Sequence, residues 1–383
     1  MVLINDSPHS PEFLADAAAA EVFLGSIGRS LTIALDTEGA SFHRFVDRIY
    51  LLQISTRQHS AIIDPLAVGT LGTLGQILEN PEIEVVFHDA DYDLRLLHQD
   101  YGWRVNNIFD TRVAAQLLGI HSFGLAALLD QYFSVKLDKK HQRADWSMRP
   151  LSQEMLDYAA QDTLYLLELR DKLADELEAK GRWSWASEEF ARLEGTRWQV
   201  EEDEVAYMRI KGARDLSRRE LAIFRELAAW RAGIARELDR ATFRVAGSDV
   251  LFETARNAPR SIDDLARVKG MPRALVERRG KEILDAVGRG LAVPEDQLPR
   301  FPRAPRWDRD SNFDARAAAL RAVRDGLAHA LKMDPGVLCA RDRLEAVARR
   351  NPGKMHELEE VQELRQWQIE VLGEAFLSAL AGK

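Results

Sequence analysis

The chain has 383 residues, of which 46% are hydrophobic and 30% charged, so it is long enough for two or three globular domains. Its single cysteine excludes an internal disulfide and is typical of a reducing compartment, which predicts a cytoplasmic protein. The net charge of −9 argues against a uniformly basic surface for nucleic acid, and no apolar run approaches the roughly 20 residues of a membrane span. The first residues lack the basic and apolar pattern of a signal peptide, so we expect none.

The first part of the chain alternates between strand and helix patterns. Short apolar runs rich in β-branched residues predict strands over 31–36, 49–56, 60–64 and 83–87. The second and third strands follow each other closely, which predicts a hairpin. Helical periodicity is present around 70–79, 92–101, 110–119, 123–133 and 152–179. This order predicts an α/β domain with a mixed β-sheet flanked by helices.

Strand patterns disappear after about residue 205, and only helical ones follow. Ser217 and Glu220 have the spacing of a capping box at the start of a long helix. Residues 292–310 contain four prolines, which is typical of an extended linker, and a second helical segment covers about 313–380. We therefore expect an α/β domain over 1–205, a helical domain over 206–291, a proline-rich linker over 292–310 and a second helical domain over 311–383.

Charge is unevenly distributed along the chain. Gly212–Gly290 contains 17 Lys and Arg against 12 Asp and Glu, a local net charge of +5 in an acidic protein. An acidic catalytic domain followed by a more basic domain is typical of a nuclease with a separate nucleic-acid-binding module. Scattered, solvated surface charge explains the same excess nearly as well.

Asp36 and Glu38 lie at the end of the first predicted strand. A spacing of two puts both carboxylates on one side of an extended chain. Mg²⁺ and Mn²⁺ prefer oxygen ligands, so the pair is a candidate half of a metal site. The alternative is an acidic pair facing solvent, because Asp-x-Glu occurs by chance in many proteins.

Three alternating aspartates, Asp89, Asp91 and Asp93, follow the fourth predicted strand. Their spacing alone does not choose among them. Leu94 and Leu97 mark one face of a helix, which places Asp93 in its first turn and lets it reach toward the end of the first strand. Asp89 and Asp91 suit positions before the helix or at its cap. We therefore expect Asp93 to join Asp36 and Glu38.

Tyr158 and Asp162 lie four residues apart in a helical pattern. This spacing puts the phenol and the carboxylate on one face of the helix, one turn apart. In that relation the two groups can hold a metal ion and steer a water toward an electrophile. Together with the acidic pair near the N-terminus, they predict one metal site.

Taken in chain order, Asp36-x-Glu38, Asp93 and Tyr158-x-x-x-Asp162 resemble the three motifs of the DEDDy 3′-to-5′ exonucleases, which have a ribonuclease H-like fold. The intervening sequence is similar to the ribonuclease D family at Leu51–Ser55, Phe109–Arg112, Gly124–Leu125 and Asp145–Ser152. The two helical segments resemble HRDC domains, the helicase-and-ribonuclease-D C-terminal modules.

The resemblance implies a 3′-to-5′ exoribonuclease that releases 5′-mononucleotides from RNA with a free 3′ end, with tRNA precursors as the expected substrate. It implies two divalent metal ions, Mg²⁺ or Mn²⁺, held by Asp36, Glu38, Asp93 and Asp162. Tyr158 is then expected to orient the attacking water, because a phenol with an ordinary pKa of about 10 is a poor general base at neutral pH. We also expect a monomer with no membrane association.

Five further residues are candidate RNA contacts: Gln53, His88, Arg143, Trp146 and Arg149. Gln53 is expected near the terminal nucleotide, with an internal hydrogen bond as an equal alternative. His88 is a candidate contact of the scissile phosphate, although a histidine that ends a buried strand is more often structural. Arg143 and Arg149 flank Trp146, which predicts stacking and charge neutralisation at an RNA end. The alternative for Trp146 is a hydrophobic anchor.

Two other functions compete with this one. A DNA 3′-to-5′ exonuclease uses the same set of carboxylates. The chain has no Gly-x-x-x-x-Gly-Lys-[Ser/Thr] loop and no polymerase-sized region, which argues against a helicase and a polymerase. A non-catalytic RNA-binding protein with a degenerate site predicts the loss of at least one carboxylate, and all four are present with the tyrosine.

Overall fold

The computed structural model describes residues 11–138, 140–199, 203–302 and 311–382, which form two compact units. Unit 1 comprises Met1–Gly39, Ile49–Trp198 and Trp307–Lys383, and unit 2 comprises Ala40–Arg48 and Gln199–Arg306. The expected domain boundaries stay a prediction. Residues 303–310 of the expected linker lie outside the described residues.

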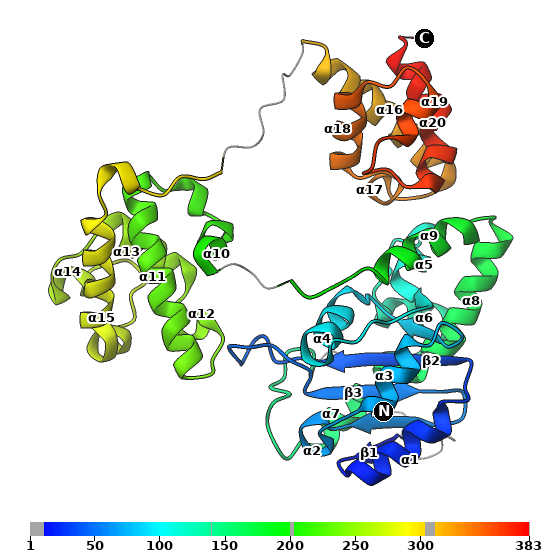
Figure 1. Ribbon diagram of the computed structural model, residues 1–383, viewed down its shortest axis with the longest axis horizontal. Coiled ribbons are helices and arrows are strands. Elements are labelled where there is room, and N and C mark those ends of the chain that lie inside the picture. Colours follow the sequence, from blue (N-terminus) through cyan, green and yellow to red (C-terminus); the bar gives the residue numbers. More distant parts are fainter. Residues whose placement is uncertain (1–10, 139, 200–202, 303–310, 383) are drawn as a thin grey trace. The chain divides into compact units, whose positions relative to one another are not determined.

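Unit 1 is built on a six-stranded sheet in the order β1-β4-β3-β2-β5-β6 (Figure 1). Its strands are β1 (Glu12–Leu14), β2 (Thr32–Glu38), β3 (Leu51–Ser55), β4 (Ser60–Ile63), β5 (Glu84–Phe87) and β6 (Ile108–Asp110). β3 runs antiparallel to both β2 and β4, whereas the other neighbours are parallel. The predicted mixed sheet and the predicted hairpin are therefore confirmed.

Helices cover both faces of this sheet. They are α1 (Ala17–Ile27), α2 (Pro65–Val68), α3 (Gly72–Glu79), α4 (Asp91–Tyr101), α5 (Thr111–Leu118), α6 (Leu125–Phe133), α7 (Gln153–Leu164), α8 (Leu166–Ala179) and α9 (Trp183–Leu193). Side chains alternate between the faces, so Ile33 and Leu35 of β2 pack with α1, α3 and α4, whereas Ala34 packs with α5, α8 and α9. Asp36 and Glu38 continue the row of Ala34.

Several elements differ from the sequence prediction. β1, β6, α1 and α9 were not predicted, and β1 and β6 have only three residues each, too few for alternation to be visible. The single helix predicted over 152–179 is divided at Tyr165 into α7 and α8. No proline or glycine marks this break. Thr163 there shares a hydroxyl–hydroxyl hydrogen bond of 2.8 Å with Ser55 of β3, a tertiary contact that the local pattern does not reveal.

The C-terminal part of unit 1 is a helical module. It consists of α16 (Phe313–Leu331), α17 (Pro335–Leu338), α18 (Arg341–Arg350), α19 (Met355–Glu359) and α20 (Gln366–Leu380). α20 packs on α9, where Trp185 and Trp367 stack with their ring centroids 4.9 Å apart. Glu189 of α9 accepts hydrogen bonds from the Trp367 indole at 3.0 Å and from Nε of Arg365 at 3.2 Å. The module is thus joined to the α/β domain by a largely buried polar contact.

We expect Glu189→Ala to lower the free energy of unfolding by about 3 kcal/mol. The substitution leaves Arg365, whose side chain is only 11% exposed, without its carboxylate, and the Trp367 indole without its acceptor. Urea unfolding followed by tryptophan fluorescence measures the loss. Glu178→Ala on the exposed side of α8 is the control, with an expected change below about 0.5 kcal/mol. Equal losses in the two variants would contradict the importance of this contact.

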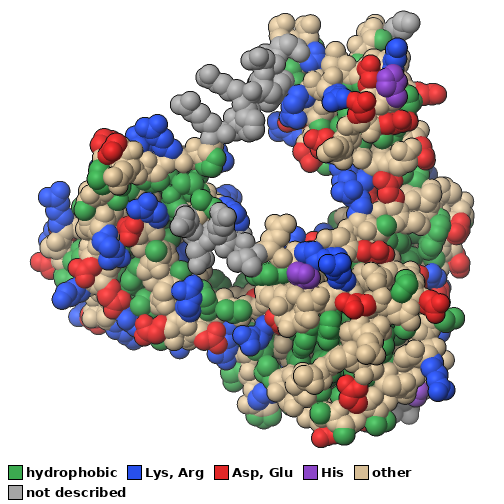
Figure 2. Space-filling view, viewed as in Figure 1, with side chains coloured by type: hydrophobic (Ala, Val, Ile, Leu, Met, Phe, Trp, Pro, Cys, Tyr) green, Lys and Arg blue, Asp and Glu red, His purple; other side chains and the backbone are tan. Residues whose placement is uncertain are grey.

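Unit 2 is helical apart from its first segment. Its helices are α10 (Asp203–Arg209), α11 (Arg218–Glu237), α12 (Thr242–Val245), α13 (Ser248–Asn257), α14 (Ile262–Ala266) and α15 (Arg273–Ala292), with short 3₁₀ turns at Ala213–Asp215 and Glu295–Gln297. The predicted capping box at Ser217 and Glu220 is confirmed. On the face seen in Figure 2, Lys and Arg side chains are interspersed with Asp and Glu, so the local charge excess is not gathered into one patch there.

Two loops complete unit 2. Residues 40–48, which follow β2 in the chain, pack on α12, where Phe42 and Phe243 meet edge to face and Arg244 donates to the Phe42 carbonyl. Residues 293–302, expected in the linker, also pack on the helices, because Leu298 is buried and its carbonyl accepts from Arg218 at 2.9 Å. No helix in the described part of either unit is long and apolar enough to cross a membrane.

Candidate active site

Three of the predicted carboxylates converge at the end of β2. Oxygen atoms of Asp36, Glu38 and Asp162 all lie within 4.8 Å of one another. Asp36 and Glu38 share one face of the strand, and α7 brings Asp162 over that face from more than 120 residues further along the chain. This spacing of oxygen ligands suits a hard divalent cation.

The fourth carboxylate, Asp93, lies in the first turn of α4 and is 5% exposed. Its Oδ1 accepts hydrogen bonds from the backbone N–H of Thr37 at 3.0 Å and from the Thr37 hydroxyl at 2.6 Å. Thr37 lies between Asp36 and Glu38 in the chain, so these hydrogen bonds hold the Asp93 side chain at the end of β2 that carries the two acidic residues. Asp89 precedes α4 and Asp91 is its first residue. Thr37 was not singled out from the sequence, which carries no signal for this role.

Burial and mutual repulsion raise the pKa of all four carboxyls. Burial dominates for Asp36 and Glu38, and their neighbours in the cluster add to it. Burial and then Asp36 raise the pKa of Asp93 well above its usual value, although the Thr37 bonds oppose the shift. Burial and Asp93 raise the pKa of Asp162 to about 7. A buried cluster of this kind lacks positive charge, which a divalent cation supplies, so the residues fit the implied metal site.

We expect the metal-free protein to gain stability as the pH falls from about 8 to about 6.5. The folded-state pKa of Asp162 is about 7 against a usual 3.8, so in this window the folded chain takes up a proton that the unfolded chain does not. The Tm measured in EDTA should therefore rise on acidification, and rise less in Asp162→Asn. Below this window His88, with a pKa lowered to about 4, acts in the opposite direction. A wild-type Tm that falls between these pH values would contradict the buried cluster.

Tyr158 lies one helical turn before Asp162. Burial, then Asp162, Glu38 and Asp36, raise the pKa of its phenol above the usual value, so the hydroxyl keeps its proton at neutral pH. Two other rings lie near its own, with centroid distances of 5.9 Å to His141 and 6.1 Å to Trp146. His141 was not predicted as a site residue, because nothing in its local sequence connects it with the helix that carries Tyr158.

Gln53 lies directly opposite Asp36 in the pairing of β3 with β2, on the same face of the sheet. Its side chain is completely buried, and neither amide atom has a hydrogen-bond partner among the described residues. The internal hydrogen bond considered as an alternative is therefore not found there. A buried amide without a hydrogen-bond partner lowers the stability of the folded protein, unless it gains a partner, for instance when substrate binds at the site.

His88 follows β5 and is partly buried. Its Nδ1 lies 2.9 Å from the hydroxyl of Thr111, which itself donates to the Phe87 carbonyl at 3.0 Å. Since the hydroxyl has only one proton, we assign Nδ1 as the donor and Nε2 as an acceptor in the neutral ring. Burial and then Arg112 lower the pKa of His88 to about 4, so the ring is neutral at physiological pH.

The remaining three candidates lie between α6 and α7. Arg143 is exposed. Trp146 is 1% exposed, in keeping with the alternative of a hydrophobic anchor, and its indole N–H has no hydrogen-bond partner within the described chain. The guanidinium of Arg149 is engaged by acceptors of the protein itself. The structure thus brings Trp146, but not the Arg149 guanidinium, into contact with the ring of Tyr158.

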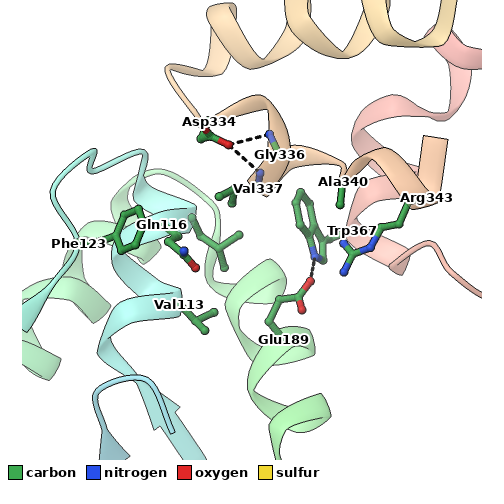
Figure 3. Close-up of a pocket in the computed structure, with 11 residues that line it drawn as sticks. Val113, Gln116, Phe123, Glu189, Asp334, Gly336, Val337, Ala340, Arg343 and Trp367 are labelled. Carbon is green, nitrogen blue, oxygen red and sulfur yellow. Dashed lines mark hydrogen bonds between the residues drawn. The ribbon is translucent and has the colours of Figure 1, made fainter. Parts of the chain in front are cut away.

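A pocket of about 450 Å³ lies elsewhere in unit 1, between α5, α9 and the C-terminal helical module (Figure 3). Its two acidic groups are engaged by the protein. Asp334 accepts from the backbone N–H groups of Gly336 and Val337, and Glu189 accepts from Trp367. None of the predicted site residues lines it, so we do not connect it with the acidic cluster.

Comparison with known proteins agrees with this geometry. Residues 11–178 match the 3′-5′ exonuclease family, and residues 220–287 and 313–380 each match the HRDC domain. The first match contains the four carboxylates and Tyr158. The two HRDC matches explain why both helical segments have the same order of a long helix, three shorter ones and a second long helix.

Individual relatives cover most of the chain. Ribonuclease D of Escherichia coli (strain K12) is 34% identical over 269 residues, 70% of this chain and 72% of its own length. Ribonuclease D of Pseudomonas paraeruginosa (strain DSM 24068 / PA7) is 30% identical over 350 residues, 91% and 92% of the two chains. The crystal structure of Escherichia coli RNase D, described as an exoribonuclease involved in structured RNA processing, superposes with a TM-score of 0.74 at 28% identity, covering 97% of this chain and 99% of that one. This chain belongs to the ribonuclease D family.

Proposed function

We propose that the chain is a 3′-to-5′ exoribonuclease that hydrolyses RNA from its free 3′ end and releases 5′-mononucleotides. The observation that carries this proposal is the convergence of Asp36, Glu38 and Asp162 at the end of β2. Asp93 is fastened beside them, and Tyr158 lies one turn away. The ribonuclease D relatives and the matched exonuclease family support it.

The four carboxylates would hold two divalent ions, Mg²⁺ or Mn²⁺. Bound there, such ions would supply the positive charge that activates a water and stabilises the leaving 3′ oxygen. In the reaction a bond forms between the water oxygen and the terminal phosphorus while the bond to the 3′ oxygen breaks. The water releases a proton to solvent, and the 3′ oxygen takes one up from solvent. Tyr158, protonated at neutral pH, orients that water by a hydrogen bond and does not accept its proton.

Three of the predicted RNA contacts suit this geometry. Gln53 offers a buried amide without a partner among the described residues on the face that carries Asp36. Neutral His88 offers Nε2 as an acceptor, which suits a ribose hydroxyl better than the phosphate first expected. Arg143 is exposed and supplies positive charge for the RNA backbone.

We propose tRNA precursors as substrates and a monomer as the active species. The experiment compares 3′-end shortening of a tRNA precursor and of RNA and DNA oligonucleotides of one sequence, with Mg²⁺, with Mn²⁺ and with EDTA. Faster metal-dependent shortening of RNA than of DNA supports the proposal. Equal or faster loss of DNA ends would favour the DNA exonuclease. Binding without shortening in either metal would favour a non-catalytic RNA-binding protein.

A further inference from the structure

Residues 140–150, which we name the 140–150 segment, lie between α6 and α7 and contact Tyr158. We propose that Arg149 is a positioning residue for the reaction, which fastens this segment so that Trp146 and His141 hold the Tyr158 ring beside the carboxylates. The inference rests on the function proposed above. It replaces the expectation that Arg149 neutralises an RNA end.

The guanidinium of Arg149 uses all its hydrogen-bond donors within the protein. A guanidinium has five N–H donors in a fixed planar arrangement. In Arg149, Nε and one Nη2 proton bind the two oxygens of Asp64 at 2.6 and 2.8 Å, and the other Nη2 proton binds the Tyr50 carbonyl at 2.8 Å. The Nη1 protons bind the carbonyls of Trp146 and Met148, both at 2.8 Å. All five donors are used within the protein, and none remains for a phosphate.

Two of the residues that accept these bonds are Tyr50, which lies next to the strand that carries the acidic pair, and Asp64, which caps a neighbouring helix. Tyr50, whose carbonyl binds Arg149, donates its own backbone N–H to the carbonyl of Glu38 at 2.8 Å. Asp64 is 4% exposed and caps α2 through the N–H of Leu66. Arg149 therefore connects the 140–150 segment with the strand end that carries the acidic pair.

Two rings of the 140–150 segment lie near the Tyr158 ring. The ring centroids of Trp146 and His141 lie 6.1 and 5.9 Å from that of Tyr158. Near the other end of the segment, Lys140 forms an ion pair with Glu154 at 2.7 Å, and His141 Nε2 lies 3.8 Å from the same carboxylate. Glu154 belongs to the first turn of α7, the helix of Tyr158. The 140–150 segment thus contacts α7 through Lys140 at one end, and Arg149 holds its other end against the sheet.

The test separates positioning from RNA binding in the full chain. Arg149→Met should lower kcat about 10- to 100-fold, the cost of a misplaced reacting group, with KM and RNA affinity within about twofold of wild type. The slope of log affinity against log salt should be unchanged, because no phosphate contact is lost. A weaker affinity with a smaller salt slope and an intact kcat would show that Arg149 binds RNA and would overturn the inference.

Arg170→Met is the matched control for lost stability. Arg170 forms a comparably half-buried ion pair with Glu84 of the same sheet, with side chains 24% and 17% exposed against 28% and 5% for Arg149 and Asp64. It should lower Tm but keep kcat within about twofold. An equal loss of kcat in both variants would mean general destabilisation and would overturn the inference. A wild-type chain that shortens no RNA would refute the proposed function itself, which is a different result.

Two more variants cover the case in which Arg149→Met fails to fold. Arg149→Lys keeps the charge but cannot make five planar hydrogen bonds, so kcat should still fall, and full activity would contradict the geometric role. Tyr158→Phe combined with Arg149→Lys should lose little more than Tyr158→Phe alone, because both changes act on the same phenol. If the factor by which kcat falls in the double variant equals the product of the factors in the two single variants, Arg149 does not act through Tyr158.

Discussion

Asp36→Asn is expected to lower kcat for RNA shortening by about 10³-fold. This is the upper end of the range of losses in kcat that follow the removal of one preorganised group that stabilises charge in the transition state. The Asp36 carboxylate lies within the cluster formed with Glu38 and Asp162, and it also raises the pKa of Asp93. An amide of the same shape keeps the packing but removes the negative charge that holds a cation. Single-turnover kinetics at saturating Mg²⁺ measure the loss.

The same substitution should leave the fold intact and raise the Tm in EDTA. Removing one of four mutually repelling carboxylates relieves repulsion in the folded state. Asp91→Asn is the matched control, because Asp91 is in the same turn as Asp93 but its side chain is 51% exposed and paired with Arg95. It should keep kcat within about twofold. Near-normal turnover in Asp36→Asn would refute the assigned site.

Tyr158→Phe is expected to lower kcat by about 10²-fold, the lower end for loss of a positioned hydrogen-bonding group in proton-transfer chemistry. The phenyl ring keeps its neighbours His141 and Trp146, so packing is retained and only the hydroxyl is lost. RNA affinity and metal affinity should be unchanged, because the phenol keeps its proton at neutral pH and contributes no charge. Single-turnover rates measure the change in kcat, RNA binding in EDTA measures the RNA affinity, and a Mg²⁺ titration without RNA measures the metal affinity.

The pH dependence identifies what the phenol does. If Tyr158 orients the water, its phenol does not set the acid limb of the kcat profile, which should persist in Tyr158→Phe at the same pH. Tyr165→Phe, at the junction of α7 and α8 and next to Phe133, is the matched control and should keep kcat within about twofold. A profile whose acid limb disappears in Tyr158→Phe would mean that the phenol is a general base.

Much of the acidic cluster could be predicted from local rules. The two-residue period of a strand placed Asp36 and Glu38 together, and the helical period placed Tyr158 one turn from Asp162. The choice of Asp93 over Asp89 and Asp91 followed from the apolar face of one helix, and the structure places it in the first turn. Each of these inferences needed only residues within a few positions of one another, plus the ordered resemblance of three motifs.

The positions of Arg149 and Trp146 relative to the rest of the protein could not be predicted in this way. The acceptors of Arg149 on Asp64 and Tyr50 lie 85 and 99 residues earlier in the chain, so a basic residue beside a tryptophan was indistinguishable from an RNA contact. The break of the predicted 152–179 helix at Tyr165 has the same origin, because Thr163 is held by Ser55 from 108 residues away. Tertiary contacts decided both cases.

The most direct test of the central assignment is product analysis on RNA labelled at its 5′ end, with wild-type chain in Mg²⁺ and in EDTA. The proposed chemistry predicts a ladder that shortens from the 3′ end, with 5′-mononucleotides as the released product by mass spectrometry. It predicts no reaction in EDTA and shortening about 10³-fold slower with Asp36→Asn. Internal cleavage, release of 3′-mononucleotides or turnover that persists in EDTA would contradict it.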